Sequence, residues 1–186
     1  MKILVCSVSA FYLFLLASTY GDELKVTGID NMPGNSSDDL VLVGYSSELE
    51  QNTTSCLKSK YEYRNNEWVH RTLDFKEKSE DFDQEVTIKI KIKVCEGAEF
   101  LEVGEDTLLR RYTGGSRTYR IRYYDNTSLV LSSIIDKTWD YCSFWVTMDH
   151  VNNISSKANE TFYKHCKEPK FVKYNQEACK NRFARV

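Results

Sequence analysis

The residues of this chain best suited to covalent chemistry are its cysteines. One of the six, Cys6, lies in an apolar run near the amino terminus, and the other five are Cys56, Cys95, Cys142, Cys166 and Cys179. In an oxidising compartment such cysteines form disulfides. Five cysteines allow two bridges with one thiol left over, and their spacing leaves several pairings open.

The histidines are not placed for catalysis or metal binding. His70, His150 and His165 fall on separate predicted elements, without the spacing of ligands to one metal ion. The chain also has no nucleophile elbow, no P-loop and no HExxH motif. We therefore expect ordinary surface histidines, no catalytic residue, no metal site, no cofactor and no enzymatic activity.

Sugar attachment is the second chemistry that the sequence suggests. Five asparagines begin an Asn-X-Ser/Thr motif in which X is not proline, and these are Asn35, Asn52, Asn126, Asn153 and Asn159. Such motifs accept N-linked glycans in proteins that pass through the secretory pathway. The sequence therefore predicts a glycoprotein whose used acceptors lie on its surface.

The amino terminus has the pattern of a secretory signal peptide. Lys2 precedes an apolar run over residues 3–17, and small residues follow at Thr19 and Gly21. The run is shorter than the roughly 20 apolar residues of a membrane span. We expect a signal peptide over residues 1–21, one domain over residues 22–186, and secretion to the extracellular space.

The charge balance excludes two classes of partner. The whole chain carries 25 basic and 27 acidic residues, for a net charge of −2. That balance offers no electrostatic reason to bind nucleic acid or an anionic membrane. We expect neither partner, and a monomeric protein.

The elements that position these residues are predicted to be strands. About eight segments alternate with period two or are rich in β-branched and aromatic residues, namely residues 40–46, 56–63, 68–75, 86–94, 98–103, 118–124, 129–135 and 138–148. They follow one another with short turns and no helix between them, which favours an up-and-down barrel or a sandwich. Eight strands close a barrel wide enough for one small ligand.

The clearest alternation lies in residues 86–94. Its apolar face points inward and carries Val86, Ile88, Ile90, Ile92 and Val94, while three lysines face solvent. Cys95 follows on the lysine side. We therefore expect Cys95 to be exposed, as a free thiol or an intermolecular link, unless the pairing differs.

After the last long strand the pattern becomes helical. Ser155 and Ser156 can cap a helix over residues 157–167, whose apolar face carries Ala158, Phe162 and Cys166 at i, i+4 and i+8. Pro169 ends the helix, and residues 171–174 form a further short strand. A barrel followed by one helix and a cysteine-bearing tail is the lipocalin layout.

Four short segments carry a resemblance to a known family. YCSFWVTMDHV (141–151), FYKHC (162–166), EAC (177–179) and TTSCLKSKY (53–61) resemble segments of tick salivary lipocalins, the histamine-binding-protein-like family. The resemblance implies an all-β fold, an eight-stranded antiparallel barrel with one C-terminal helix packed outside. It also implies secretion into the bite, where members bind small mediators or host proteins and dampen host defence.

The same resemblance implies two disulfides, Cys56–Cys179 and Cys142–Cys166. The residue pattern agrees with the second bridge. Cys142 shares a strand face with Phe144, Val146 and Met148, so docking the apolar helix face there would bring the two sulfurs together. Ser143, Trp145 and Thr147 would then point into the barrel.

The chain departs from the pattern of the amine-binding members. Those members carry Cys-Asp-aliphatic in an earlier strand and Glu-Leu-Trp in a later one, and the two acids pair with the ammonium of the ligand. Here the strands read SLVLSSI and Ser143-Phe144-Trp145. A cation in a low-dielectric barrel needs a counter-charge, so amine binding is not favoured unless Asp74, Glu99 or Glu102 faces inward.

The candidate ligand-binding residues are aromatic side chains on the predicted strands together with Ser143. They are Tyr45, Tyr61, Tyr63, Phe75, Phe100, Tyr119, Tyr123, Ser143 and Trp145. These side chains either line a pocket or simply fill the core of the barrel.

Three functions follow from these observations. The first is a secreted lipocalin that sequesters a small, largely apolar ligand (a fatty acid, eicosanoid or sterol) and modulates host immunity or inflammation. The second is an immunomodulator that binds a host protein or host immune cell through its outer surface. The third is a scavenger of histamine or serotonin with displaced acids.

Overall fold

The computed structural model describes residues 31–49, 54–78, 83–95, 97, 99–104, 117–135, 138–172, 174 and 179. The predicted signal peptide and the acceptor Asn52 lie outside the described residues. The described residues form nine strands: β1 Leu40–Ser46, β2 Thr54–Asn65, β3 Trp68–Lys78, β4 Asp83–Val94, β5 Phe100–Gly104, β6 Thr118–Tyr124, β7 Ser128–Ile135, β8 Thr138–Thr147 and β9 Pro169–Phe171. The α-helix α2 spans Ser156–His165, and two 3-10 turns, η3 and η4, span Ser47–Leu49 and Met148–His150.

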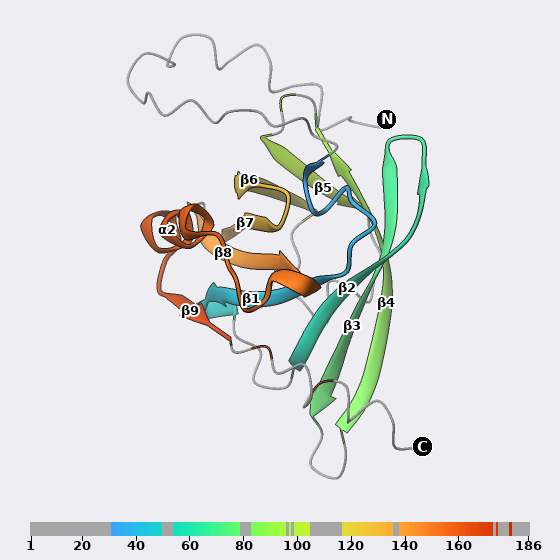
Figure 1. The fold of residues 1–186 in the computed structure, drawn as a ribbon, viewed down its shortest axis with the longest axis horizontal. Helices are drawn as coiled ribbons and strands as arrows, with labels where there is room; N and C mark the ends of the chain where they lie inside the picture. Colours follow the sequence, from blue (N-terminus) through green and yellow to red (C-terminus); the bar gives the residue numbers. More distant parts are fainter. Residues whose placement is uncertain are drawn as a thin grey trace.

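The first eight strands form one closed antiparallel barrel. Neighbours follow the order β2-β3-β4-β5-β6-β7-β8-β1, and β1 pairs again with β2. Leu40 closes the ring, because it lies opposite Thr147 of β8 and opposite Ser59 of β2. Strand β9 adds to β1 outside the ring, and α2 also lies outside it (Figure 1). The predicted eight-stranded barrel with one external helix is confirmed.

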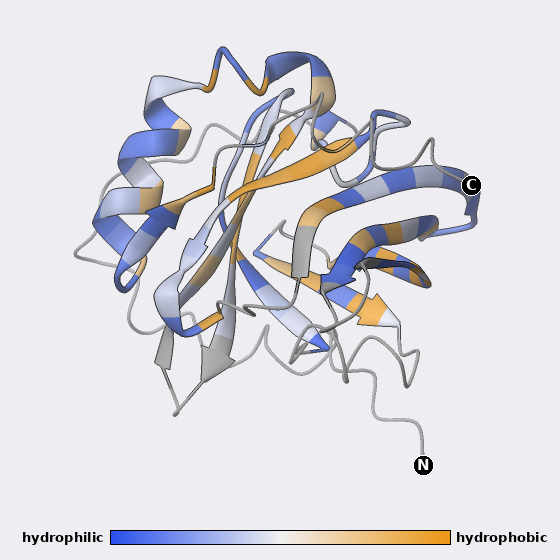
Figure 2. Cartoon of the chain, turned by 90° about the horizontal axis from the view of Figure 1, so that it is seen from below, coloured by the Kyte–Doolittle hydropathy of each residue, from blue (hydrophilic) through white to orange (hydrophobic). Residues whose placement is uncertain are grey.

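Alternation along the strands separates an inner from an outer face, seen as alternating bands in Figure 2. Ile88, Ile90 and Ile92 of β4 are buried inside, while Lys89 and Lys91 are exposed. A second apolar cluster lies between the outer face of β8 and α2, and it includes Val41, Val43, Val130, Cys142, Phe144, Val146, Ala158, Phe162 and Cys166. The strand therefore presents Cys142 outward, as its residue pattern predicts.

Helix α2 docks through the face that its sequence predicts. The N-cap Ser155 accepts the amide N–H of Ala158 at 3.4 Å, and Ala158 and Phe162 are fully buried. The rings of Phe144 and Phe162 lie 5.3 Å apart. Gly44 allows this approach, since a Cβ atom there would lie 3.0 Å from the Phe162 ring.

Two disulfides hold the carboxyl-terminal part of the chain to the barrel. Cys142 is bonded to Cys166 and Cys56 to Cys179, with Cα–Cα distances of 5.5 Å and 5.7 Å. Both are the pairs that the family resemblance implies. No helix in the described part of the chain is long and apolar enough to cross a membrane.

The expectation of an exposed, free Cys95 is wrong. Its side chain is buried, and its sulfur is disulfide-bonded. The register does not change at this point: β4 ends at Val94, but the amide of Cys95 still donates to the carbonyl of Phe100 at 2.9 Å and so continues the β4–β5 ladder. Cys95 therefore keeps the outward direction that the alternation predicts, and it is buried on that face because other parts of the chain cover it, which the alternation of one strand does not reveal.

Candidate ligand-binding site

The interior of the barrel is lined by apolar side chains from the seven strands β2 to β8 and from the segment before β1. The buried members are Met32, Val69, Leu73, Phe75, Ile88, Ile90, Ile92, Leu101, Val103, Ile121, Leu129 and Leu131. Seven further side chains pack against them yet are only partly buried: Leu57, Tyr61, Val86, Val94, Tyr119, Tyr124 and Trp145. The inner wall thus carries apolar and aromatic surface that the protein does not fully cover.

Six of the nine candidate residues lie on this inner face. Phe75 belongs to the buried cluster, and Tyr61, Tyr119 and Trp145 pack against it. Ser143 shares the face because it pairs with the buried Leu131. Tyr45 lies directly opposite Ser143 on β1.

The other three candidates do not face the interior. Tyr63 is 51% exposed and stacks on His70 outside the barrel, with ring centroids 4.2 Å apart. Tyr123 packs in the outer cluster beneath α2, and its hydroxyl donates to Asp125 at 2.8 Å. Phe100 alternates with the inward-facing Leu101 and therefore lies on the opposite face of β5.

Irregular register explains two of these corrections. The pairing of β2 with β3 shifts between Tyr61 and Tyr63, and that of β6 with β7 shifts between Ile121 and Tyr123. A bulge of this kind reverses the face of every later side chain on its strand. Tyr124, which was not among the candidates, therefore takes an inward position. Because residues 123 and 124 are both tyrosines, the sequence alone does not show which of the two faces the interior.

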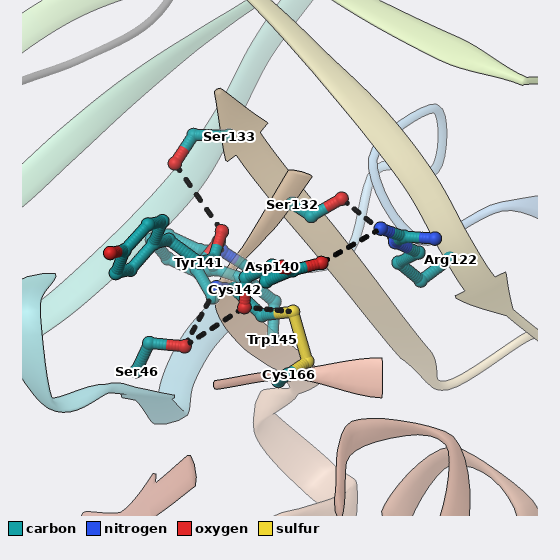
Figure 3. The surroundings of a disulfide bond; sticks show 10 residues. Ser46, Arg122, Ser132, Ser133, Asp140, Tyr141, Cys142, Trp145 and Cys166 are labelled. Carbon is teal, nitrogen blue, oxygen red and sulfur yellow. Dashed lines mark hydrogen bonds and ion pairs between the residues drawn. A yellow bond between two sulfur atoms is a disulfide. The ribbon is translucent and has the colours of Figure 1, made fainter. Parts of the chain in front are cut away.

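A polar strip runs along the inner face of β7 and β8. The indole Nε1–H of Trp145 donates to Ser143 Oγ at 3.0 Å. The Ser133 hydroxyl donates to the carbonyl of Tyr141 at 3.3 Å (Figure 3). These are neutral groups, and they add hydrogen-bonding capacity to a wall that is otherwise apolar.

Among the described residues, Arg71 is the one buried side chain of the inner face that carries a positive charge. Its side chain is 1% exposed and lies on the face of Val69, Leu73 and Phe75. Burial lowers the pKa of the guanidinium to about 10, although Asp39 and Asp38 oppose the shift. In the sequence, this site can be recognised because the charged Arg71 stands among alternating apolar residues of one strand face.

All hydrogen-bond acceptors of Arg71 are uncharged oxygens. Nε donates to Ser59 Oγ at 3.0 Å, and the two terminal nitrogens donate to the carbonyls of Gly34 (3.4 Å), Ser36 (2.8 Å), Asp38 and Ser59 (3.3 Å). A guanidinium has five N–H donors. The five contacts therefore occupy all of them.

These bonds hold residues 32–38 across one end of the barrel. Met32 is 1% exposed within the interior cluster, and a Cβ atom on Gly34 would lie 3.4 Å from Ile92 and 3.6 Å from Leu129. The segment leads into β1 and is the blue coil in Figure 1. Strands β1, β3, β5 and β7 end at the opposite end of the barrel, because neighbouring strands are antiparallel.

The carboxylates considered for amine binding are not inside. Asp74 is the only buried carboxylate of the described residues; it lies on the outer face of β3, where it pairs with Lys60 at 2.6 Å and accepts the Thr87 hydroxyl at 3.0 Å. Glu102 pairs in register with Lys93 on the outer face, and Glu99 is exposed before β5. The described interior thus offers a cation no buried counter-charge.

The remaining candidate residues lie at the surface or between elements. Among the predicted sugar acceptors, Asn126 and Asn153 are exposed, and Asn35 and Asn159 are partly buried. Glycan attachment stays a prediction. No three His, Cys, Asp or Glu side chains of the described segments gather where they could hold a metal ion.

The sequence of this chain is similar to those of known proteins. The model of the tick histamine binding protein family matches residues 20–181. Japanin of Rhipicephalus appendiculatus is 31% identical over 180 residues, which cover 95% of this chain and 98% of that protein. Japanin-like-RS of Rhipicephalus sanguineus is 29% identical over 180 residues, which again cover 95% of this chain and 98% of that protein.

The fold is also similar to that of a solved crystal structure. The orthorhombic crystal form of Japanin from Rhipicephalus appendiculatus, bound to cholesterol, superimposes with a TM-score of 0.71 at 29% sequence identity. The match covers 78% of this chain and 98% of that chain.

Proposed function

Because this chain belongs to the tick histamine-binding protein family, we propose that it is a secreted, monomeric salivary lipocalin that holds a small, largely apolar ligand in its barrel and modulates the host immune or inflammatory response. The observation that carries the proposal is the inner wall. Apolar and aromatic side chains line it, seven of them are partly uncovered, and the one buried charge among the described residues of this wall has its donors paired with uncharged protein oxygens.

The cholesterol bound to Japanin supports an apolar ligand of sterol size. Burying about 300 Å² of apolar ligand surface stabilises a complex by roughly 7 kcal/mol before the costs of association. A cation inside the same wall would lose its hydration without a carboxylate to replace it, at a cost of several kcal/mol. The balance favours an apolar ligand over histamine or serotonin.

A ligand that is carried through purification would test the proposal directly. We expect native mass spectrometry of the full-length protein from eukaryotic cells to show a stoichiometric lipid. We also expect delipidated protein to bind added cholesterol. Protein that arrives empty and does not bind cholesterol or any other lipid would contradict the proposal.

A second candidate function rests on the outer surface. Tyr163 of α2 is 57% exposed and Phe171 of β9 is 37% exposed, and their ring centroids lie 5.6 Å apart. Exposed aromatic pairs are typical of protein contact surfaces. Binding of labelled protein to host leukocytes, compared with a Tyr163→Ser and Phe171→Ser double variant, distinguishes this function from ligand sequestration.

A further inference from the structure

The polar groups inside the barrel limit the chemistry of a ligand that it can hold. Arg71 cannot receive a ligand carboxylate without losing a protein contact, because all five of its N–H donors are occupied. An ammonium has no buried carboxylate to meet, since Asp74 faces outward and pairs with Lys60. Both charged ends are therefore disfavoured.

Ser143 offers what these groups do not. Its Oγ accepts the indole N–H of Trp145 at 3.0 Å, and no other described residue bonds to it. A serine hydroxyl has one donor and two acceptor lone pairs. One donor and one lone pair therefore remain, on a side chain that is only partly buried.

The surroundings of Ser143 are suited to the polar end of an apolar molecule. Tyr45 lies opposite it on β1 and Leu131 opposite it on β7, and both share its inward face. The apolar cluster continues from Leu131 across the barrel. A ligand with one oxygen at this point would place its hydrocarbon body against that cluster.

We propose that the barrel selects a neutral, apolar ligand with a single hydroxyl group, and that Ser143 is the residue that recognises this hydroxyl. The inference rests on the proposed function and specifies its ligand class. A ligand hydroxyl can form one hydrogen bond with Ser143, either by donating to the lone pair that remains or by accepting the Ser143 proton. Trp145 acts as a positioning residue, because its N–H fixes which lone pair of Ser143 is already used.

Matched probes separate the hydroxyl from the hydrocarbon. Cholesterol and 5α-cholestane differ in the hydroxyl and one double bond, and stearyl alcohol and stearate differ in the charge of one end. Delipidated full-length protein is titrated with each probe while tryptophan fluorescence is followed. Variants are Ser143→Ala, Tyr61→Phe and, as the outward-facing control on the neighbouring strand, Ser132→Ala.

The expected result is a preference that depends on one residue. Cholesterol should bind roughly tenfold more tightly than cholestane, the size of one hydrogen bond. Ser143→Ala should remove that difference by weakening cholesterol alone, whereas Ser132→Ala should retain it. Stearyl alcohol should bind more tightly than stearate at neutral pH.

The contrary results separate this inference from the proposed function. If cholesterol and cholestane bind equally and Ser143→Ala changes neither, the inference is wrong while the apolar barrel stands. Tighter binding of stearate would overturn the preference for neutral ligands. If Tyr61→Phe and not Ser143→Ala removes the preference, the assignment to Ser143 is wrong. If no probe binds, the proposed function falls and the inference with it.

Discussion

At the scale of single residues, Arg71 shows how a buried charge can stabilise a barrel without a carboxylate. Its guanidinium binds three carbonyls of residues 34–38 and two oxygens of Ser59. Hydrogen bonds to charged groups contribute about 1.5–3 kcal/mol each, and a large part offsets the cost of burying the charge. The residue therefore joins the segment before β1 to the strands β2 and β3.

Replacing Arg71 should release that segment. We expect Arg71→Met to lower the free energy of unfolding by about 3–5 kcal/mol, since it removes the donor and leaves buried carbonyls unpaired. Urea unfolding measures the loss. The control is Arg64→Met, which removes one exposed bond to the carbonyl of Asn35 at 2.9 Å and should cost under about 1 kcal/mol. Equal losses in both variants would contradict the role given to Arg71.

Ser143 also permits a prediction on charge. Ser143→Glu places a carboxylate beside Trp145, whose ring can stack on a cation. A partly buried charge pair contributes about 1–3 kcal/mol, so histamine affinity should rise roughly ten- to hundred-fold over a weak or undetectable wild-type value. Calorimetric titration measures it, with Ser143→Gln as the uncharged control. No gain in the Glu variant would show that this position does not reach the ligand.

At the scale of elements, the sequence predicts a strand or a helix correctly where its apolar residues keep one regular spacing along the whole element. Residues 86–94 alternate without interruption, and the structure extends that strand only to Asp83. The spacing of Ala158, Phe162 and Cys166, with a serine cap, predicted α2 and its buried face. Both cases depend on local geometry alone, which the sequence contains.

Two of the three misplaced candidates lie where closure of the barrel overrides local pattern, whereas Phe100 follows the simple alternation of β5 and points outward. The bulges beside Tyr63 and Tyr123 adjust strand twist so that the ring can close, and nothing in the local residue types requires them. Residues 32–38 have no period, so their position across the barrel end could not be read from the sequence. Only Arg71, a charge within an apolar face, indicated that something polar lies inside.

The docking of α2 on the barrel gives a prediction at this scale. A Cβ atom on Gly44 would lie 3.0 Å from the Phe162 ring and 3.3 Å from the carbonyl of Lys170, closer than ordinary contact. We expect Gly44→Ala to lower the free energy of unfolding by about 1–2 kcal/mol through overpacking. Gly34→Ala is the matched control, because its Cβ contacts begin at 3.4 Å, and it should change stability by under about 0.5 kcal/mol. Thermal unfolding compares the two.

At the scale of the whole molecule, the barrel is a container whose parts are joined from distant points of the chain. Cys56–Cys179 spans 123 residues and Cys142–Cys166 spans 24. Such bridges stabilise mainly by restricting the unfolded chain, by about 3–5 kcal/mol each in the chain-entropy account. Residues 32–38, which Arg71 binds, lie across one end of the barrel.

Because a ligand inside this barrel can bind only the folded chain, binding must raise the stability of the whole molecule. Free cholesterol at about 100 times its dissociation constant should add roughly 2.7 kcal/mol to the free energy of unfolding. For a domain of this size that corresponds to a rise in melting temperature of roughly 5–10 °C. Differential scanning calorimetry of the delipidated protein measures it, with equimolar histamine as the control that should leave the melting temperature unchanged. At the same cholesterol concentration, the ligand should raise the free energy of unfolding of Ser143→Ala by about 1.4 kcal/mol less than that of the wild type. This difference corresponds to a tenfold weaker affinity. A rise with histamine and none with cholesterol would show that a counter-charge for amines exists in the barrel after all.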